Sequence, residues 1–320
     1  MSVKENILEI LEKNKNSSVS GQFIAENLGV SRAAVWKAVK SLRDEGYSIS
    51  AVNNQGYCLG EDSDVLSVPA IKSFLHEDVN LIVLKTVDST NNYAKKLAME
   101  NAPDKTVVVS ETQTAGKGRL GRNFFSPDKT GLYMSVLFRP EKSAGETLFI
   151  TIAAAVAVCR AIETVSELFP QIKWVNDIFV NGKKVCGILT EASASMENQM
   201  IEYAVLGIGI NVKSADFPND LKNIAGSLGD EKISRSRLCA EILNELLELY
   251  SLEDKKALID EYKKRSLVLG KEVKFTKNGK TYSGVACDIN DSGNLIVKTA
   301  KGTETLISGE ISIGSENYAE

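Results

Sequence analysis

Hydrophobic side chains near the start of the chain recur at the spacing of helices. Apolar positions three or four residues apart predict two amphipathic helices, one with Ile7, Leu8, Ile10 and Leu11 and the next with Phe23, Ile24 and Leu28. Gly29 then suits a tight turn, and Ser31 is a favourable N-cap for a third helix. This succession has the spacing of a helix-turn-helix.

The third predicted helix, from Ser31 to Arg43, separates apolar from basic side chains. Ala34, Val35, Ala38, Val39 and Leu42 fall on one arc that would face a core. The other side carries cations and no acid, as expected of a helix in the major groove of DNA, and the candidate contacts are Ser31, Arg32, Trp36, Lys37, Lys40 and Arg43. An inert solvated face, with Trp36 simply packing, is the alternative.

A hairpin pattern over residues 47–59 completes a predicted winged helix-turn-helix domain, residues 1–63. The acidic segment 60–67 is expected to be a linker. Beyond it, a central mixed α/β domain is predicted over residues 64–267. Strand-like runs lie at 81–87, 106–109, 132–138, 178–180, 183–190 and 204–212, and helical patterns at 91–99, 146–163, 235–250 and 255–264. Asp88-Ser89-Thr90 would cap the helix at 91–99, and a helix start suits a polar or anionic ligand.

From Gly270 onward, short strand patterns are separated by turn pairs: Asn278-Gly279, Ser292-Gly293 and Lys301-Gly302. They predict a small antiparallel barrel over residues 268–320. It can be a structural cap on the preceding domain or a docking module for a partner. The fold class as a whole is multidomain α+β.

Composition narrows the classes of function. The formal net charge of −4 argues against general coating of nucleic acid, so DNA contacts should be confined to a local patch. Five cysteines without a C-x-x-C pair predict reduced, buried thiols in a cytoplasmic protein. The single histidine, His76, argues against histidine triads and histidine-rich zinc sites. No signal-peptide pattern opens the sequence, and the apolar run Phe149–Cys159 is shorter than the roughly 18 residues that a membrane span needs.

Three glycines and three cations are concentrated directly after the strand pattern at 106–109, in the sequence from Ser110 to Arg122. Gly116, Gly118 and Gly121 spell G-x-G-x-x-G, but the sequence after Arg122 breaks any helix, so the dinucleotide fingerprint fails. The Walker pattern fails because neither its first glycine nor its final hydroxyl residue is present. With both nucleotide motifs excluded, the sequence predicts a loop between two strands that folds over an anion. A solvated basic turn is the alternative.

The ordered motifs resemble the biotin-protein ligases that also act as biotin operon repressors. They are D-S-T-N at 88–91, E-T-Q-T-A-G-K-G-R-L-G-R at 111–122, K-W-V-N-D at 173–177, G-K-K-V-C-G-I-L at 182–189 and G-I-G-I-N at 207–211. The resemblance covers essentially the whole chain and implies an SH3-like barrel at its end. Val175, Lys117 and Phe124 depart from the proline, arginine and tryptophan that are usual in the family.

The resemblance implies a biotin site formed by Ser89, Thr90, Asn91, Gln113, Gly116, Lys117, Gly118, Arg119, Lys184, Gly187 and Gly207. It implies an adenylate site formed by Arg119, Arg122, Phe124, Asn176 and Asn211, and catalytic roles for Lys184, Arg119 and Asp177. Biotin and ATP would form biotinyl-5′-adenylate, with Mg²⁺ carried by ATP and no metal site in the protein. The implied partners are a lysine of biotin carboxyl carrier protein, operator DNA and a second copy of the chain in an adenylate-promoted homodimer; no membrane partner is expected.

Two other functions stay open at this point. A lipoate-type ligase can use the same scaffold, and a transcription factor can sense a small ligand without catalysis. Lys184 and a complete glycine-basic loop argue against the transcription factor, and the winged helix favours the ligase and repressor over a purely metabolic ligase.

Overall fold

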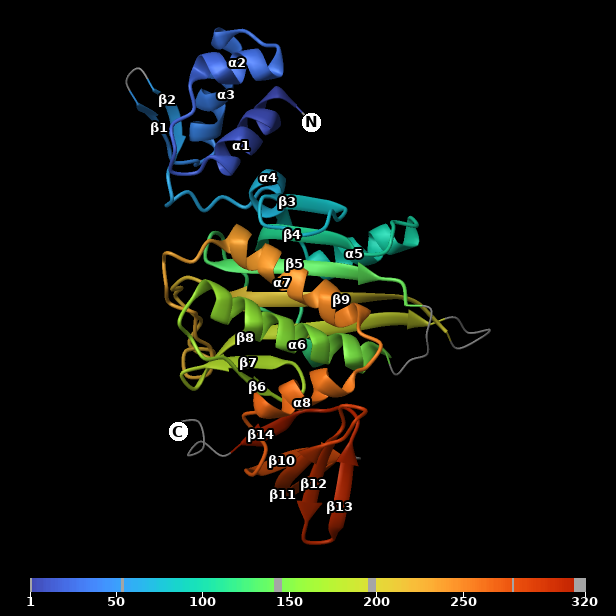
Figure 1. Cartoon of the computed structure of the whole chain (residues 1–320). Helices are drawn as coiled ribbons and strands as arrows, with labels where there is room; N and C mark the ends of the chain where they lie inside the picture. The colour runs from blue at the N-terminus through green and yellow to red at the C-terminus, as the bar shows by residue number, and fades with distance from the viewer. Residues whose placement is uncertain (1, 53–54, 141–145, 195–199, 278, 314–320) are drawn as a thin grey trace. The chain divides into compact units, whose positions relative to one another are not determined.

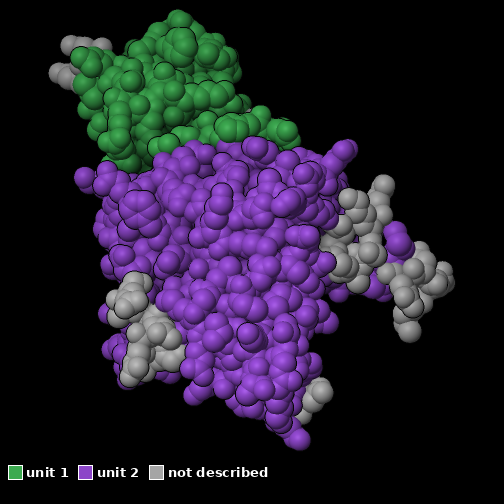
Figure 2. All heavy atoms as spheres, turned by 60° about the horizontal axis from the view of Figure 1, so that its bottom comes forward, with its two compact units in different colours: residues 1–78, 234–240 green, residues 79–233, 241–320 purple. Residues whose placement is uncertain are grey.

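A computed structural model describes residues 2–52, 55–140, 146–194, 200–277 and 279–313. The chain forms two compact units, coloured separately in Figure 2. Unit 1 contains residues 1–78 and 234–240, and unit 2 contains residues 79–233 and 241–320. The domain limits drawn from the sequence at residues 63 and 267 stay predictions.

Unit 1 begins with three helices and a hairpin, in the order α1 (Val3–Lys13), α2 (Gly21–Leu28), α3 (Arg32–Asp44), β1 (Ile49–Val52) and β2 (Gly56–Leu59) (Figure 1). The two strands pair antiparallel. Gly29 ends α2 in the left-handed region at φ 64°, and the Ser31 side chain accepts a hydrogen bond from the Ala34 amide at the start of α3. The predicted winged helix-turn-helix is confirmed.

Most of the apolar side chains predicted to face the core of unit 1 do so. Ile7, Leu11, Ile24 and Leu42 are almost completely buried. The prediction for Phe23 is wrong, because its side chain is 52% exposed. Ile24 and Leu28 lie one turn apart on the inner face of α2, and Phe23 points about 100° away from Ile24.

The acidic segment after the hairpin, predicted to be a linker, lies within unit 1 and is fixed there by hydrogen bonds. Asp64 accepts hydrogen bonds from the backbone amide and the Nε of Arg235 at 2.8 and 2.9 Å, and its carbonyl accepts one from Nη2 at 2.7 Å. Arg235 is only 1% exposed, so its charge depends on this pairing. A short helix, α4 (Val68–Lys72), follows and packs against α1.

A seven-stranded sheet is the centre of unit 2. Its strand order is β3 (Leu81–Val87), β4 (Thr106–Gln113), β5 (Gly131–Phe138), β9 (Ile201–Asn211), β8 (Lys183–Ala194), β7 (Asp177–Val180) and β6 (Gln171–Lys173). Strands β3 and β4 are parallel, and the other described pairs in this sheet are antiparallel. The sheet confirms the predicted mixed α/β domain.

Different helices cover the two faces of this sheet. On one face, α6 (Glu146–Val165) places Thr151 Oγ1 2.7 Å from Thr190 Oγ1, and α7 (Arg235–Ser251) contributes Tyr250 against Phe138 (Figure 1). On the other face, α5 (Thr90–Met99) packs through small alanines against β4, β5 and β9. The helix α5 covers one end of its face, and the part beyond its N-terminus is available for a ligand.

Helix α6 is apolar along most of its length because it lies within the core. Its stretch Thr147–Val165 has a mean hydropathy of 1.9, which passes a length and composition test for a membrane-crossing helix. Yet 72% of that window is buried inside the protein, as in the core helix of a globular domain.

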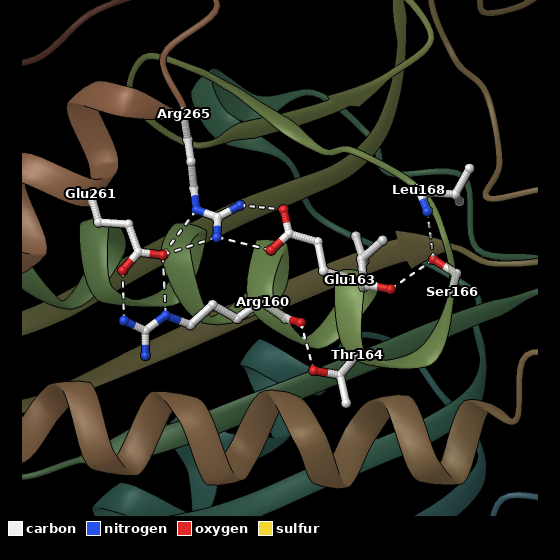
Figure 3. Close-up of polar contacts among 8 residues, drawn as sticks. Arg160, Glu163, Thr164, Ser166, Leu168, Glu261 and Arg265 are labelled. Carbon is white, nitrogen blue, oxygen red and sulfur yellow. Dashed lines mark hydrogen bonds and ion pairs between the residues drawn. The ribbon is translucent and has the colours of Figure 1, made fainter.

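Salt bridges connect α6 to α7 and to α8 (Lys256–Lys264), as Figure 3 shows in part. Arg160 on α6 binds Glu261 and Glu245 at 2.6 and 2.9 Å. Arg265 binds Glu163 at 2.6 Å and Glu261 at 3.0 Å. Burial raises the pKa of Glu261, but the hydrogen bonds from the two arginines outweigh it and hold the pKa below its ordinary value.

We expect Glu261→Gln to lower the free energy of unfolding by about 1 to 3 kcal/mol at neutral pH, because it removes charge-assisted hydrogen bonds to two arginines. A carboxylate with a lowered pKa stabilises the folded state above its unfolded pKa, and this contribution is lost as pH falls through the folded pKa. The difference from wild type should therefore shrink on acidification. Urea denaturation at neutral and acidic pH measures it, with exposed Glu167→Gln as the control. If the difference in unfolding free energy between Glu261→Gln and wild type persisted at acidic pH, the stabilising role of the ionised Glu261 would be contradicted.

The C-terminal part of unit 2 is a five-stranded antiparallel sheet. Its order is β13 (Gly302–Leu306), β12 (Leu295–Thr299), β11 (Lys280–Ile289), β10 (Glu272–Lys277) and β14 (Ile311–Ile313). This confirms the predicted C-terminal β domain, whereas its SH3-like closure stays a prediction; Asn278 of the first predicted turn lies outside the described residues.

The prediction of buried thiols holds for three cysteines. All five cysteines are free; Cys159, Cys186 and Cys239 are buried and Cys58 is half-buried. The prediction for Cys287 is wrong, because this residue is exposed at a β-bulge between Ala286 and Asp288.

Candidate functional site

A cavity of about 260 Å³ opens on the face of the large sheet that α5 leaves uncovered. Fifteen of the predicted ligand residues line it: Ser89, Thr90, Asn91, Gln113, Lys117, Gly118, Arg119, Arg122, Phe124, Asn176, Asp177, Lys184, Gly187, Gly207 and Asn211. Gly116 is not among the lining residues. Gly116 is buried within the loop, and a Cβ there would lie 2.5 Å from the Phe124 carbonyl oxygen. The missing side chain at Gly116 therefore makes room for the protein's own backbone and not for a ligand.

One end of the cavity is polar because the N-terminus of α5 meets the end of β4. The Ser89 side chain caps α5, and the Gln113 Oε1 accepts hydrogen bonds from the Thr90 amide and hydroxyl at 2.9 and 3.1 Å. Gln113 Nε2 donates to Ser126 Oγ at 2.9 Å. Three hydrogen-bonding side chains are therefore held in fixed orientations on the cavity wall, as recognition of a small polar group requires.

A buried network orients Asn91 behind this polar end. The Ser135 hydroxyl lies 2.6 Å from Asn91 Oδ1 and 2.8 Å from Thr90 Oγ1, and Asn91 Nδ2 donates to Glu191 Oε2 at 2.9 Å. Burial raises the pKa of Glu191, but the hydrogen bonds from Lys95 and Asn91 dominate and lower it. A carboxylate kept ionised fixes which way the Asn91 amide points.

Three glycines make a flat floor for the cavity. Gly209 and Gly207 on β9 face the same side as their cross-strand neighbours Gly187 and Leu189 on β8. A Cβ at Gly207 would overlap Asn91 Oδ1, and one at Gly209 would lie 2.6 Å from the Phe124 ring. Phe124 therefore lies directly on the sheet at one side of the cavity.

We expect Gly209→Ala to displace Phe124, to weaken ligand binding and to cost about 1 to 3 kcal/mol of folding free energy, because the added methyl overpacks the ring. Gly187→Ala is the matched control: its Cβ would contact the same ring at 3.4 Å, an ordinary contact distance. Thermal unfolding of both variants measures the effect on stability, and ligand titration of Gly209→Ala measures the effect on binding, because Gly187 is itself a predicted biotin contact. Equal behaviour of the two variants would show that the ring moves freely.

The predicted glycine-basic loop crosses the cavity mouth and is fixed at three points. Lys117 Nζ donates to Asn92 Oδ1 on α5 at 2.6 Å, Arg119 Nη1 to Asn176 Oδ1 at 2.8 Å, and Arg122 Nη2 pairs with Glu310 at 2.7 Å. Between these contacts the loop makes a single 3₁₀ turn, Arg119–Gly121, in which Leu120 is left-handed at φ 54° and 76% exposed. The loop thus brings cations over the cavity, and its own backbone hydrogen bonds, such as that from the Gly118 amide to the Arg122 carbonyl at 2.7 Å, fix its shape.

Lys184 and Asp177 form an ion pair on the wall opposite α5. Lys184 Nζ lies 2.7 Å from Asp177 Oδ1, and the two side chains are 32% and 20% exposed. The Lys184 backbone is also fixed, because its amide donates to the Ile224 carbonyl and its carbonyl accepts from the Gly226 amide, both at 2.9 Å. Such a lysine can meet an anion at a defined position.

The two asparagines predicted for the adenylate site also support the walls of the cavity. Asn176 Nδ2 donates to the Ile188 carbonyl at 2.9 Å, and Asn211 Nδ2 donates to the Gly226 carbonyl at 2.9 Å. Three apolar side chains from the segment after β9, Phe217, Leu221 and Ile224, also line the cavity. Phe217 contacts Phe125 edge to face, with ring centroids 6.2 Å apart.

The predicted DNA face of unit 1 is exposed. Arg32, Lys37, Lys40 and Arg43 are all exposed on α3, and Trp36 is 58% exposed, so it does not pack in the core. Lys40 Nζ lies 5.7 Å from the Trp36 ring centroid. Arg43 Nε donates to the Ile49 carbonyl at 2.6 Å and Ser31 caps α3, so these two side chains also serve the fold.

Sequence reasoning missed several residues of the site. Ser135, Ser126 and Glu191 orient its polar end, while Lys173, Trp174 and Phe217 line it. A signal existed for Ser135, a small polar residue flanked by apolar ones in the buried strand Gly131–Phe138. For Glu191 no local signal existed, since its partner Asn91 lies 100 residues earlier.

Three family patterns match the chain in order. They are a helix-turn-helix (HTH) domain over residues 3–58, the Biotin/lipoate A/B protein ligase family over residues 83–211, and the Biotin protein ligase C terminal domain over residues 268–314. The bifunctional ligase/repressor BirA of Bacillus spizizenii is 37% identical over 98% of this chain and 99% of its own length.

Solved structures show the same fold. A biotin protein ligase from Aquifex aeolicus, in complex with biotin and ATP, matches 73% of this chain and 97% of its own, with 30% identity and a TM-score of 0.61. A biotin protein ligase from Leishmania major in complex with biotinyl-5-AMP matches 72% of this chain and 100% of its own, with 25% identity and a TM-score of 0.52.

Proposed function

The chain belongs to the family of bifunctional ligase/repressors named BirA, and from this premise we propose which residues carry each activity. It is an ATP-dependent biotin-protein ligase that carries a DNA-binding repressor domain. The observation that carries the proposal is one cavity that has hydrogen-bonding groups at the N-terminus of α5, cations at the other end and a glycine floor between them.

We propose that the polar end binds the ring of biotin. Ser89, Thr90 and Gln113 supply fixed donors and acceptors for a ureido group, and Gly207 leaves room beside the bicycle. The biotin tail then runs along the floor past Gly187 toward Lys184. This path fits a ligand with a compact polar head and a carboxylate at the end of an aliphatic chain.

At the cationic end we propose that the biotin carboxylate attacks the α-phosphorus of ATP. A new C–O–P linkage forms in biotinyl-5′-adenylate, and the bond to the β-phosphate breaks to release pyrophosphate. Lys184 and Arg119 are the cations proposed to stabilise the negative charge that develops, because preorganised cations lower the barrier of such a step. Arg122, Phe124, Asn176 and Asn211 are the proposed contacts of the adenylate moiety.

Mg²⁺ is proposed to enter with ATP and to share the charge of its phosphates. Within the described residues there is no group of three or more His, Cys, Asp or Glu side chains that could hold a metal ion. Asp177 is the carboxylate that lies beside the proposed phosphate site, so it can bind a metal that the nucleotide carries.

The second half-reaction is proposed to transfer biotin to a lysine of biotin carboxyl carrier protein. The neutral lysine amine attacks the adenylate carbonyl, an amide bond forms and AMP leaves. An exposed lysine with a pKa near ~10.4 is almost fully protonated at neutral pH, so a base must take its proton. Asp177 is the proposed base. Incubation with carrier protein, ATP and biotin, followed by detection of biotin on the carrier lysine, tests transfer; no labelled carrier would refute it.

We propose that the adenylate also controls repression, through a homodimer that binds operator DNA in the cytoplasm. The edge strand β3 pairs with β4 on one side and supports dimerisation, because its other side can pair with the same strand of a second copy. One winged helix makes few base contacts, so we propose that a dimer recognises a two-fold operator site. Five free cysteines support a reducing compartment.

The control is tested by sedimentation velocity and operator titration of apo, biotin-bound and adenylate-bound protein at one salt concentration. We expect the adenylate-bound form to dimerise and bind operator more tightly than the apo form, and operator DNA to tighten adenylate binding reciprocally. Equal dimerisation and equal operator affinity in all three forms would refute adenylate control. The lipoate-ligase and ligand-sensor alternatives are not favoured, because the whole-chain relatives are ligase/repressors.

A further inference from the structure

Lys173 is a cation of the cavity wall to which no role has been given above. It ends β6, where it lies opposite Asp177 in the antiparallel pair with β7, and it lines the cavity. Its side chain is half-buried, with Nζ 5.9 Å from the ring centroid of Phe179. The aromatic ring supports the side chain and attracts its charge without neutralising it.

Strand register places Lys173 on the same face as the proposed catalytic pair. Asp177 and Phe179 are two residues apart on β7, so both point to the face of their cross-strand partners. Those partners are Lys173 opposite Asp177 on β6, and Lys184 opposite Phe179 on β8. Asp177 therefore has one lysine on each side, and it forms its ion pair with Lys184.

Among the described residues, Lys173 differs from the other cations of the cavity in its contacts. Lys184 pairs with Asp177, Arg122 with Glu310, Arg119 with Asn176 and Lys117 with Asn92. Within the same described part of the chain, Lys173 has no hydrogen-bond or ion-pair partner, and its contact is the Phe179 ring. A half-buried ammonium without a counter-charge is placed to receive an anionic ligand.

We propose that Lys173 binds the β- and γ-phosphates of ATP and stays with pyrophosphate as it leaves. The inference rests on the proposed adenylation reaction. Lys184 contacts the attacking carboxylate and the α-phosphate. Lys173, on the other side of Asp177, stabilises the negative charge that pyrophosphate gains when its bond to the α-phosphorus breaks. Two lysines on opposite sides of the breaking bond would divide the charge that the reaction moves.

The experiment separates the two half-reactions. Lys173→Met keeps the aliphatic stem over Phe179 and removes the charge, while Lys173→Arg keeps a charge. Adenylate formation is followed by pyrophosphate release from ATP and biotin, and transfer is followed from preformed biotinyl-5′-AMP to the carrier protein. We expect Lys173→Met to slow adenylation by about 10²-fold, the size of effect seen when one preorganised contact to developing charge is lost.

Transfer from preformed adenylate should stay within about twofold of wild type, because that step contains no pyrophosphate. Lys173→Arg should restore much of the adenylation rate. Gln171→Ala, an exposed position on the same strand, is the control and should leave both steps unchanged.

Three results would overturn the inference: an equal loss of both half-reactions in Lys173→Met, an unchanged adenylation rate, or no recovery in Lys173→Arg. An equal loss would show a structural role for Lys173. Failure of the proposed function looks different, since wild-type protein would then form no adenylate from biotin at all.

Discussion

Lys184→Ala is expected to lower the rate of biotinyl-adenylate formation by about 10² to 10³-fold, because a cation aligned with developing charge acts mainly in the transition state. The variant also leaves Asp177 without its ion-pair partner in a partly buried site. Steady-state kinetics of pyrophosphate release, with ATP and biotin each varied in turn, measure kcat and KM for both substrates.

Lys183→Ala is the matched control for this prediction. Lys183 is the preceding residue, but its Nζ donates to the Asn223 carbonyl at 2.7 Å and it does not line the cavity. The control should keep most of the wild-type rate. If Lys184→Ala raised the KM for biotin and left kcat unchanged, Lys184 would be a ground-state binding residue and the proposed catalytic role would be wrong.

The double variant Lys37→Ala/Lys40→Ala is expected to abolish specific operator binding at physiological salt while ligation continues. Both lysines are exposed on α3, away from the buried face formed by Val35, Val39 and Leu42. Each phosphate contact that is lost should also reduce the slope of log K against log salt by roughly 0.9. Fluorescence anisotropy with operator DNA over a range of salt concentrations gives both quantities.

Lys13→Ala, an exposed lysine on α1 paired with Glu9, controls for the loss of positive charge in the same domain. It should bind operator nearly as wild type does. If operator affinity fell equally in the control and in the double variant, the effect would be a nonspecific effect of charge. The helix α3 would then not be the helix that recognises the operator.

Most of the fold could be predicted from local sequence patterns. The helix-turn-helix followed from the periodicity of α1 to α3 and from two local backbone signals, the left-handed Gly29 and the Ser31 cap, both of which the structure shows. The same kind of evidence gave β3, α5 and the β7–β8 hairpin. Errors occurred where burial depends on a side chain's angular position or on an irregular strand, as at Phe23 and at Cys287 in its bulge.

The residues expected in the site could be named because each belongs to a motif, and the cavity then brought most of them together. What orients them could not be read from the chain. Asn91 and Glu191 are 100 residues apart, and Arg122 and Glu310 are 188 apart. Such pairs depend on sheet register and on packing between sheets, which no local spacing encodes. Lys173 shows the same limit, since its relation to Lys184 follows from β6 and β8 both flanking β7.

The central claim is that this cavity makes biotinyl-5′-adenylate, and the most direct measurement is mass spectrometry of the adenylate. Purified full-length protein is incubated with ATP and, separately, with biotin, lipoate or octanoate, and the products are extracted and weighed. We predict the mass of biotinyl-5′-AMP in the biotin reaction and no comparable adenylate from the other two acids. An adenylate formed from lipoate or octanoate, with none from biotin, would contradict the account.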